Sequence, residues 1–315
     1  MSNPVRVAVV GAGAMASEHI RAFAALPDVT IAGIHSRTRA RAQALADMVD
    51  IPVVADDIRS LKARTDADLV VVTVPEMAAN AVAKACLQEE WAILLEKPAG
   101  HDLADAEDIA AAAASHARPV MVALNRRFYG SLAAARADLD TCAEPRFIHI
   151  QDQQSFAEAR RYNHPEPVVQ KFMYANSIHM IDLILALGRG AVTEVTPVLP
   201  WRGEHTDVVL ALVGFDSGDR ALYQGLWQGP GPWACSISMP SRRWLLQPVE
   251  RASYQNAGER SQNPVEPNPS DTDYKPGFLR QAEAVVACVR GEPSAAVGIA
   301  QALETMRLIH RIFGT

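Results

Sequence analysis

The amino-acid sequence predicts an α/β protein with a doubly wound parallel sheet in its N-terminal part and a second α/β domain with a mainly antiparallel sheet. Two observations carry this prediction. Short apolar runs alternate with helical patterns as far as residue 124, which is typical of a parallel sheet. From about Pro145, polar and apolar residues alternate within paired runs, as in half-buried antiparallel strands. A length of 315 residues, at roughly 100–200 residues per domain, also predicts two domains, which we place at residues 1–124 and 125–315.

The composition excludes several classes of partner. A net charge of −6 provides no basic field for nucleic acid or an anionic membrane, so we expect neither as a partner. No apolar stretch approaches the ~18 uninterrupted residues of a membrane span, and we find no signal-peptide pattern. The four cysteines are far apart and show no metal-binding spacing. We therefore expect a cytoplasmic protein with reduced thiols and no metal.

The first element is an apolar, β-branched run at Val5–Val10, which predicts a strand buried on both faces. The stretch GAGAMA follows and opens a helical pattern. Gly11 permits a tight turn, Gly13 allows the backbone to approach a pyrophosphate, and the small Ala16 allows the helix to lie close to the strand. Phosphates would then bind at the helix N-terminus. The alternative is a glycine-rich turn without a ligand. The predicted phosphate-binding residues are Gly11, Gly13, Ala14 and Met15.

The second strand, Val29–Ile34, is followed by HSRTRAR instead of the acid that usually binds the ribose of NAD. Hydroxyl and guanidinium donors suit a 2′-phosphate, so we favour NADP(H) over NAD(H). Alternatively, Ser36 or Thr38 caps the next helix and the arginines face solvent. The predicted contacts to this end of the cofactor are Ser36, Arg37, Thr38 and Arg41.

Further strands are predicted at residues 52–55, 68–74, 91–95 and 119–124. Because open α/β sheets bind ligands beyond the carboxyl ends of their strands, we expect Val74, Pro75, Glu96 and Lys97 to contact the cofactor. Lys97 follows a strand directly and could exchange protons near neutral pH. The alternative is an edge lysine paired with Glu96.

Five strands are predicted in the second half, and a hairpin turn at DSGDR joins two of them. We expect residues 256–276, rich in Pro, Asn, Ser and Gly, to form a mobile surface loop near the cleft. Helices follow at about 277–290 and 298–313. The predicted strands are 146–154, 207–215, 221–228, 233–239 and 244–249.

The stretch KFMYANSIHMIDL, residues 171–183, predicts a buried helix with one histidine, His179. On an α-helix, Ala175, His179 and Asp182 share one stripe. Asn176 or Ser177 could cap the start of the helix and Gly188 could end it. The pattern leaves two interpretations open: a histidine paired with Asp182 in the core, or a catalytic residue.

Four motifs together resemble the Gfo/Idh/MocA family of NAD(P)-dependent oxidoreductases, over nearly the whole chain. They are the glycine turn, E-K-P at 96–98, N-R-R-F at 125–128 and H-M-I-D at 179–182. The resemblance implies a Rossmann domain followed by an α/β domain with an open-faced sheet, a homodimer or homotetramer, and a sugar, cyclitol or related polyol as substrate. It implies catalytic roles for Lys97 and His179, and a cis Lys97–Pro98 bond.

Two departures from the family pattern concern the site. Ala175 stands where the family motif has an acid, and Ser177 stands where it has a glycine. An alanine side chain accepts no hydrogen bond and relays no proton.

We therefore predict hydride transfer between NADP(H) and a secondary alcohol or ketone. One alternative is a cofactor-binding sensor without turnover. Another is an enzyme that uses transient oxidation for a non-redox outcome such as glycoside cleavage. The predicted substrate contacts are Arg161, Tyr162, His164, Asn176 and His179.

Overall fold

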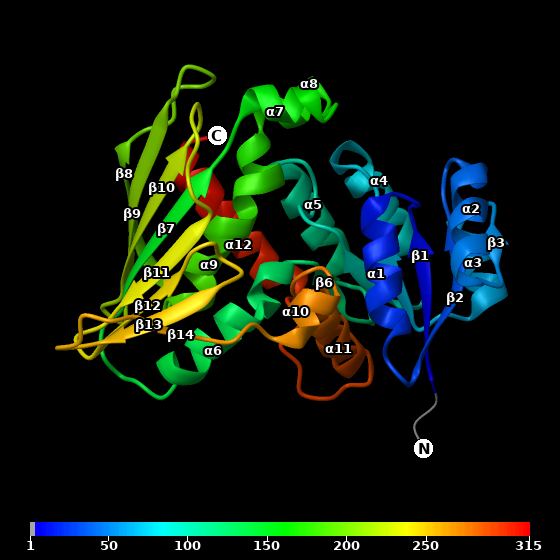
Figure 1. Cartoon of the computed structure of the whole chain (residues 1–315). Helices are drawn as coiled ribbons and strands as arrows, with labels where there is room; N and C mark the ends of the chain where they lie inside the picture. Colours follow the sequence, from blue (N-terminus) through cyan, green and yellow to red (C-terminus); the bar gives the residue numbers. More distant parts are fainter. Residues whose placement is uncertain (1–3) are drawn as a thin grey trace. The chain divides into compact units, whose positions relative to one another are not determined.

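The computed structural model describes residues 4–315, and the chain forms two compact units (Figure 1). The first unit comprises the residues up to Asn125 together with Asp273–Leu303. The second comprises Arg126–Thr272 and Glu304–Thr315. The first boundary lies one residue from the predicted one. The predicted second domain differs, because the chain returns to the first unit for residues 273–303. Helix α11 (Phe278–Val289) causes this return, since its apolar face completes the core of the first unit.

The first unit contains a six-stranded, entirely parallel sheet in the order β3-β2-β1-β4-β5-β6, as predicted. The order reverses between β1 and β4, which is where open α/β sheets bind ligands. Every strand predicted for this part of the chain is present. The strands are β1 (Val5–Val10), β2 (Val29–His35), β3 (Val54–Ala55), β4 (Leu69–Val72), β5 (Ala92–Leu95) and β6 (Val120–Val122).

Helices flank this sheet, and their starts follow from local chemistry. The start of α3 has a capping box in which the Ser60 N–H donates to Asp57 Oδ1 over 2.6 Å. Asp102 caps α5 in the same way, accepting from the Asp105 N–H. The helices up to residue 113 are α1 (Ala14–Ala24), α2 (Arg39–Val49), α3 (Ile58–Thr65), α4 (Glu76–Cys86) and α5 (Leu103–Ala113).

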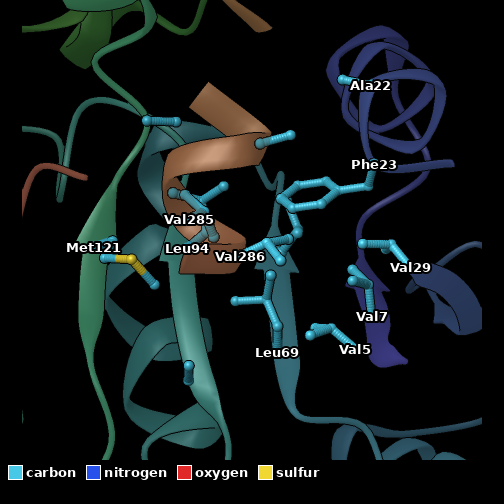
Figure 2. Packing of buried hydrophobic residues seen from close by; sticks show 14 of the residues in the cluster. Val5, Val7, Ala22, Phe23, Val29, Leu69, Leu94, Met121, Val285 and Val286 are labelled. Atoms are coloured by element: carbon cyan, nitrogen blue, oxygen red, sulfur yellow. The ribbon is translucent and has the colours of Figure 1, made fainter. Parts of the chain in front are cut away.

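The core of the first unit joins segments far apart in the sequence. Figure 2 shows Phe23 of α1, Leu69 of β4 and Val285 of α11 within one apolar cluster. These side chains are almost fully buried, and each contributes roughly 1.5–3 kcal/mol relative to an exposed position. Both faces of the sheet are covered, so its strands are continuous apolar runs.

The second unit contains an eight-stranded sheet in the order β14-β13-β12-β11-β7-β10-β9-β8. All neighbours are antiparallel except β7 and β10, so the predicted, mainly antiparallel sheet is confirmed. The strands are β7 (Phe147–Gln153), β8 (Val192–Leu199), β9 (Val208–Phe215), β10 (Arg220–Leu226), β11 (Ala234–Ser238), β12 (Arg242–Leu246), β13 (Ala252–Asn256) and β14 (Asn263–Pro264).

Three strands of this sheet were not predicted: β8, β13 and β14. The edge strand β8 is mostly exposed and contains Pro197, so it has neither an apolar alternation nor a full set of backbone donors. The predicted loop 256–276 holds β14 and the short helix α10 (Pro269–Asp273). Asp271 of α10 accepts the Gly130 N–H over 2.5 Å, which fixes part of this segment.

Helices α9 (Ile178–Leu187) and α12 (Ile299–Phe313) lie on one face of this sheet (Figure 1). Side chains of its strands, among them Phe147 and Leu212, are 44–45% exposed, which fits an open-faced sheet. Among residues 4–315, no helix has the length and apolar character that crossing a bilayer requires. The other helical segments are α6 (Gly130–Leu139), α7 (Phe156–Arg161), α8 (Glu166–Gln170), the 3-10 turn η1 (Asn125–Phe128) and the π-helical turn η2 (Met173–Ser177).

Candidate functional site

The glycine turn between β1 and α1 has the geometry of a phosphate-binding turn. Gly11 has φ +114°, and a Cβ there would collide with the carbonyl and hydroxyl oxygens of Thr73, so no other residue fits. Gly13 is the exposed N-cap of α1, and a Cβ there would meet nothing within 4 Å. The free N–H groups and the positive end of the helix dipole are therefore accessible to a pyrophosphate. Ala16 is fully buried against the strand.

The end of β2 carries the predicted 2′-phosphate contacts. Ser36 is half-buried, and Arg37, Thr38 and Arg41 are exposed. Thr38 occupies the N-cap position of α2, but its side chain makes no capping hydrogen bond. The alternative in which the Thr38 hydroxyl caps this helix is therefore not observed. The first turn of α2 contains no acid, although the helix dipole favours negative charge there. An anion bound at this N-terminus would supply that charge.

The ends of β1, β4 and β5 bring the remaining cofactor candidates to one edge of the sheet. The Thr73 N–H donates to the Val10 carbonyl over 2.8 Å, and the Glu96 N–H donates to the Val72 carbonyl over 2.8 Å. Val74 and Pro75 follow β4 directly, and Pro75 precedes the first residue of α4. The glycine turn, Val74–Pro75 and Lys97 therefore share the carboxyl edge of the sheet.

Glu96 uses both carboxylate oxygens within the protein. Its Oε1 lies 2.9 Å from Nε2 of the buried His19, and its Oε2 accepts the Lys97 N–H over 3.0 Å. Burial by itself raises the pKa of Glu96, but the hydrogen bond with His19 and the charges of His19 and Lys97 outweigh burial, so the pKa lies below its ordinary value. An ionised Glu96 thus holds the backbone of Lys97. Its predicted contact with the cofactor stays a prediction.

The loop after Lys97 is held by α5. The Lys97–Pro98 bond is cis, as the resemblance implied. Gly100 has φ +95°, and a Cβ there would lie 2.5 Å from the Asp105 Cβ. The Asp105 carboxylate accepts the His101 N–H over 3.2 Å and contacts the His101 ring Nδ1 at 2.5 Å. The segment that carries Lys97 is therefore ordered by neighbours on both sides.

In the second unit, His179 is half-buried in the first turn of α9. Asp182 is 1% exposed, and Arg127 donates two hydrogen bonds to it over 2.7 and 2.6 Å. Thr305 donates a third over 2.8 Å. These contacts assign Asp182 to the core.

The predicted helix start was wrong in one respect. The chain enters α9 through the π-helical turn Met173–Ser177, so Ala175 does not lie on a regular α-helical stripe with His179. Ser177 precedes α9 in helical conformation and makes no capping hydrogen bond, because the preceding turn already supplies helical backbone. Gly188 ends the helix as predicted.

Of the predicted substrate residues, Arg161 ends α7, and Tyr162 and His164 lie between α7 and α8. The Arg161 guanidinium stacks 5.3 Å from the centroid of the Tyr162 ring, and Tyr162 is 68% exposed. The His164 ring contacts Phe172 edge-on at 5.4 Å, next to the π-helical turn. The structure brings His164 to the segment that carries Asn176, and it leaves Arg161 and Tyr162 on the surface.

Two functional candidates, His19 and Asp152, were missed by sequence reasoning. Both interrupt an apolar pattern. His19 lies on the buried face of α1 with Ala16, and Asp152 shares the inward phase of β7 with Ile148 and Ile150. A charged or titratable residue at an inward position was the available signal.

Comparisons with known proteins concern the family and the fold. Residues 5–124 match the model of an oxidoreductase family with an NAD-binding Rossmann fold. Inositol 2-dehydrogenase 1 of Saccharopolyspora erythraea is 29% identical over 61% of this chain and 57% of its own length. The uncharacterized oxidoreductase YrbE of Bacillus subtilis is 25% identical over 41% of this chain and 38% of its own length. The chain thus matches well under two thirds of the length of both relatives. A 4-carboxy-2-hydroxymuconate-6-semialdehyde dehydrogenase of Sphingobium sp. is 22% identical over 97% of this chain and 96% of its own length.

Solved structures resemble the whole chain. A dehydrogenase from Chromobacterium violaceum has a TM-score of 0.85 at 20% identity and covers 99% of this chain and 95% of its own. A levoglucosan dehydrogenase in complex with NADH and levoglucosan has a TM-score of 0.81 at 16% identity, covering 98% and 96%. At these identities the likeness shows the fold alone.

Proposed function

The chain belongs to the Gfo/Idh/MocA family of oxidoreductases, and on that premise we propose that it transfers hydride between a nicotinamide cofactor and a secondary alcohol or ketone of a sugar, cyclitol or related polyol. The observation that carries the proposal is the shared sheet edge. An open glycine turn and a lysine whose backbone N–H is held by the half-buried Glu96 carboxylate both follow strands of the same parallel sheet. The bound nicotinamide supplies the hydride chemistry.

Lys97 handles the proton in this proposal. It takes the hydroxyl proton when the alcohol is oxidised and returns it when the ketone is reduced. The cofactor and substrate geometry depends on the backbone of Lys97, which Glu96 and the loop to Asp105 hold. His179 is the second residue to which the proposal gives a catalytic role, as a hydrogen-bonding group for the substrate.

NADP(H) is the proposed cofactor form. The support is the pair of exposed arginines, Arg37 and Arg41, at a helix start without an acid. Changing both to alanine is expected to raise the KM for NADP⁺ about ten- to hundredfold, because the charge-assisted hydrogen bonds to the 2′-phosphate would be lost. The KM for NAD⁺ should stay unchanged. Equal effects on both cofactors would contradict the assignment.

Association into homo-oligomers is also proposed. The register places Leu212 opposite Leu222, and the exposed Phe147 lies in the neighbouring strand. Large exposed side chains on one sheet face are typical of an interface. Light scattering after size exclusion tests this, and a monomer at micromolar concentration would contradict it.

The test of the function is turnover with Lys97→Met. We expect a loss of at least ~10²-fold in kcat, since a general acid–base contributes about 10²–10⁴-fold. Binding of NADPH, followed by its fluorescence, should be retained. Lys84→Met is the matched control, because Lys84 lies on α4 and pairs with Asp108 at the surface. Unimpaired turnover by Lys97→Met would sink the assignment.

A cofactor-binding sensor without turnover is the second candidate. Ala175 favours it, because this side chain is 5% exposed and offers no acceptor at a position where the family motif has an acid. Tight NADPH binding with no hydride exchange across myo-inositol, glucose and levoglucosan would support the sensor. Reduction of the cofactor by any of these polyols would exclude it.

A further inference from the structure

A chain of three hydrogen-bonded side chains leads from the core of the second unit to the π-helical turn. Asp152 on β7 is 1% exposed and accepts the Gln154 Nε2–H at its Oδ1 over 2.7 Å. Gln154 is also 1% exposed, and its Oε1 accepts the Asn176 Nδ2–H over 2.8 Å. Tyr223 donates its hydroxyl to the other oxygen of Asp152 over 2.8 Å. The chain starts at a buried acid and ends at Asn176.

The chemistry of Asp152 fixes the direction of every bond in this chain. A carboxylate only accepts hydrogen bonds, so Gln154 must turn its NH₂ group toward Asp152. The Gln154 carbonyl oxygen then faces Asn176, so Asn176 must donate a hydrogen bond to it from its own NH₂ group. This direction belongs to the ionised form of Asp152. Burial raises the pKa of Asp152, and its hydrogen bonds with Tyr223 and Gln154 and the charge of the buried Arg126 act against that rise. The Asn176 carbonyl oxygen is thereby turned away from the core.

Asn176 also lies at an unusual place in its segment. From Phe172 to Ile184 every residue is buried except Asn176 and His179, which are half-buried. The two polar side chains that reach the surface are therefore the predicted catalytic histidine and the end of the buried chain. π-helical turns are frequent at functional sites, and the turn at Met173–Ser177 contains Asn176. The adjacent Ala175 offers no acceptor.

We propose that Asn176 is a substrate-positioning residue whose carbonyl oxygen, oriented by Gln154 and Asp152, accepts a hydrogen bond from a hydroxyl group of the substrate. The inference rests on the proposed function and names the feature that the site selects. A ligand needs a hydroxyl donor in addition to its reacting group, because the amide presents an acceptor. Polyols meet this requirement, and simple ketones and monoalcohols do not. Asn176 thus supplies the acceptor that Ala175 lacks.

The first experiment measures steady-state kinetics with myo-inositol, glucose and levoglucosan as probes, with NAD⁺ and NADP⁺. For any probe that turns over, Asn176→Ala should raise the polyol KM about three- to tenfold, the effect of one lost hydrogen bond. The cofactor KM should stay unchanged. Gln154→Met should act in the same direction, and the double variant should be no worse than Asn176→Ala alone. Gln224→Met is the matched control. Gln224 bonds His149, and both side chains lie on the face of the sheet opposite to Asp152.

The second experiment tests the orientation without any substrate. Asn176→Asp places an acceptor opposite the Gln154 carbonyl oxygen, so its melting temperature should fall below that of Asn176→Ala. Adding Gln154→Met removes the opposing oxygen and should recover most of that loss. A melting temperature of Asn176→Asp equal to that of the wild type would overturn the orientation.

Failures of the inference and of the function give different results. If the wild type oxidises a probe and Asn176→Ala keeps the same polyol KM, the inference is wrong and the function stands. If calorimetry shows that a probe binds in a manner that depends on Asn176 but no hydride moves, the proposed reaction is wrong and the inference stands. If no probe binds to the cofactor-loaded protein, both are overturned.

Discussion

Asp219 and Asp152 are both buried carboxylates of the second unit, yet their partners differ. Asp219, which precedes β10, is fully buried and pairs with Arg189, whose Nη2 and Nε lie 2.6 and 3.0 Å from its oxygens. It also accepts the backbone N–H groups of Arg146 and Arg189. Asp152 instead accepts from the neutral groups of Tyr223 and Gln154.

The two environments shift the carboxyl pKa values in opposite directions. Burial raises both, but at Asp219 the hydrogen bonds and charge of Arg189 outweigh burial and the pKa lies below its ordinary value. At Asp152 burial prevails over the neutral donors and the charge of Arg126, and the pKa lies above its ordinary value. The hydrogen bonds to the Asp219 carboxylate all come from Arg189 and from backbone N–H groups, so this carboxylate stabilises the fold. One partner of Asp152 is Gln154, which in turn bonds Asn176, so this carboxylate also orients the Asn176 amide.

The largest expected effect is on stability at Asp219. Asp219→Ala leaves Arg189 without its carboxylate and two N–H groups without an acceptor. We expect a loss of about 3–5 kcal/mol in the free energy of unfolding, as for other broken buried pairs. Denaturant unfolding measures it. Glu304→Ala is the control, because the exposed Glu304–Arg307 pair should contribute no more than about 1 kcal/mol. Similar losses for both variants would break the comparison.

Asp152→Asn should have a smaller effect on stability and a larger effect on the polyol KM. The amide fills the same space but no longer fixes the direction of the Gln154 amide. We expect a loss of about 1–3 kcal/mol, and a polyol KM raised as in Gln154→Met. A loss equal to that of Asp219→Ala, with an unchanged KM, would place Asp152 with Asp219 as a structural residue.

Tyr223→Phe removes one neutral donor to Asp152 and leaves Gln154 in place. The expected loss in the free energy of unfolding is about 1 kcal/mol, the net value of one hydrogen bond. Because the Gln154 bond persists, the polyol KM should stay close to that of the wild type. A KM shift as large as that of Gln154→Met would show that Tyr223 also orients the chain.

The smallest effect is the pH dependence, and its sign separates the two acids. The folded pKa of Asp219 is lowered, so its stabilisation is present above the unfolded pKa of about 3.9 and is lost as pH falls through the folded value. The folded pKa of Asp152 is raised, so its contribution is present below the unfolded pKa and is lost as pH rises through the folded value. On acidification, the stability of the wild type relative to Asp219→Ala should shrink, and relative to Asp152→Asn it should grow. Unfolding curves at several pH values measure both, and parallel trends would contradict the assignment.

Most of the fold and part of the site could be predicted from local patterns. Buried strands are visible as apolar runs, and the glycine turn and Lys97 are visible because their neighbours in sequence define their position. Buried polar pairs are different, since the partners lie far apart in sequence. His19 bonds a residue 77 positions away, and Asp152 bonds one 71 positions away. The hydrophobic periodicity of a sequence reports local structure, so it does not reveal which distant residues pair. The π-helical turn before His179 also departs from the 3.6-residue period of an α-helix.

The return of the chain to the first unit has a consequence for biosynthesis. Phe278, Val285 and Val286 of α11 belong to the same core as Phe23 and Leu69. A ribosome makes them only after residues 126–272, which at ~5–20 residues per second takes on the order of ten seconds or more. Throughout that interval the nascent N-terminal sheet lacks the helix that covers part of its apolar surface. The nascent chain therefore leaves part of the apolar surface of this sheet exposed to water until translation has passed the second unit.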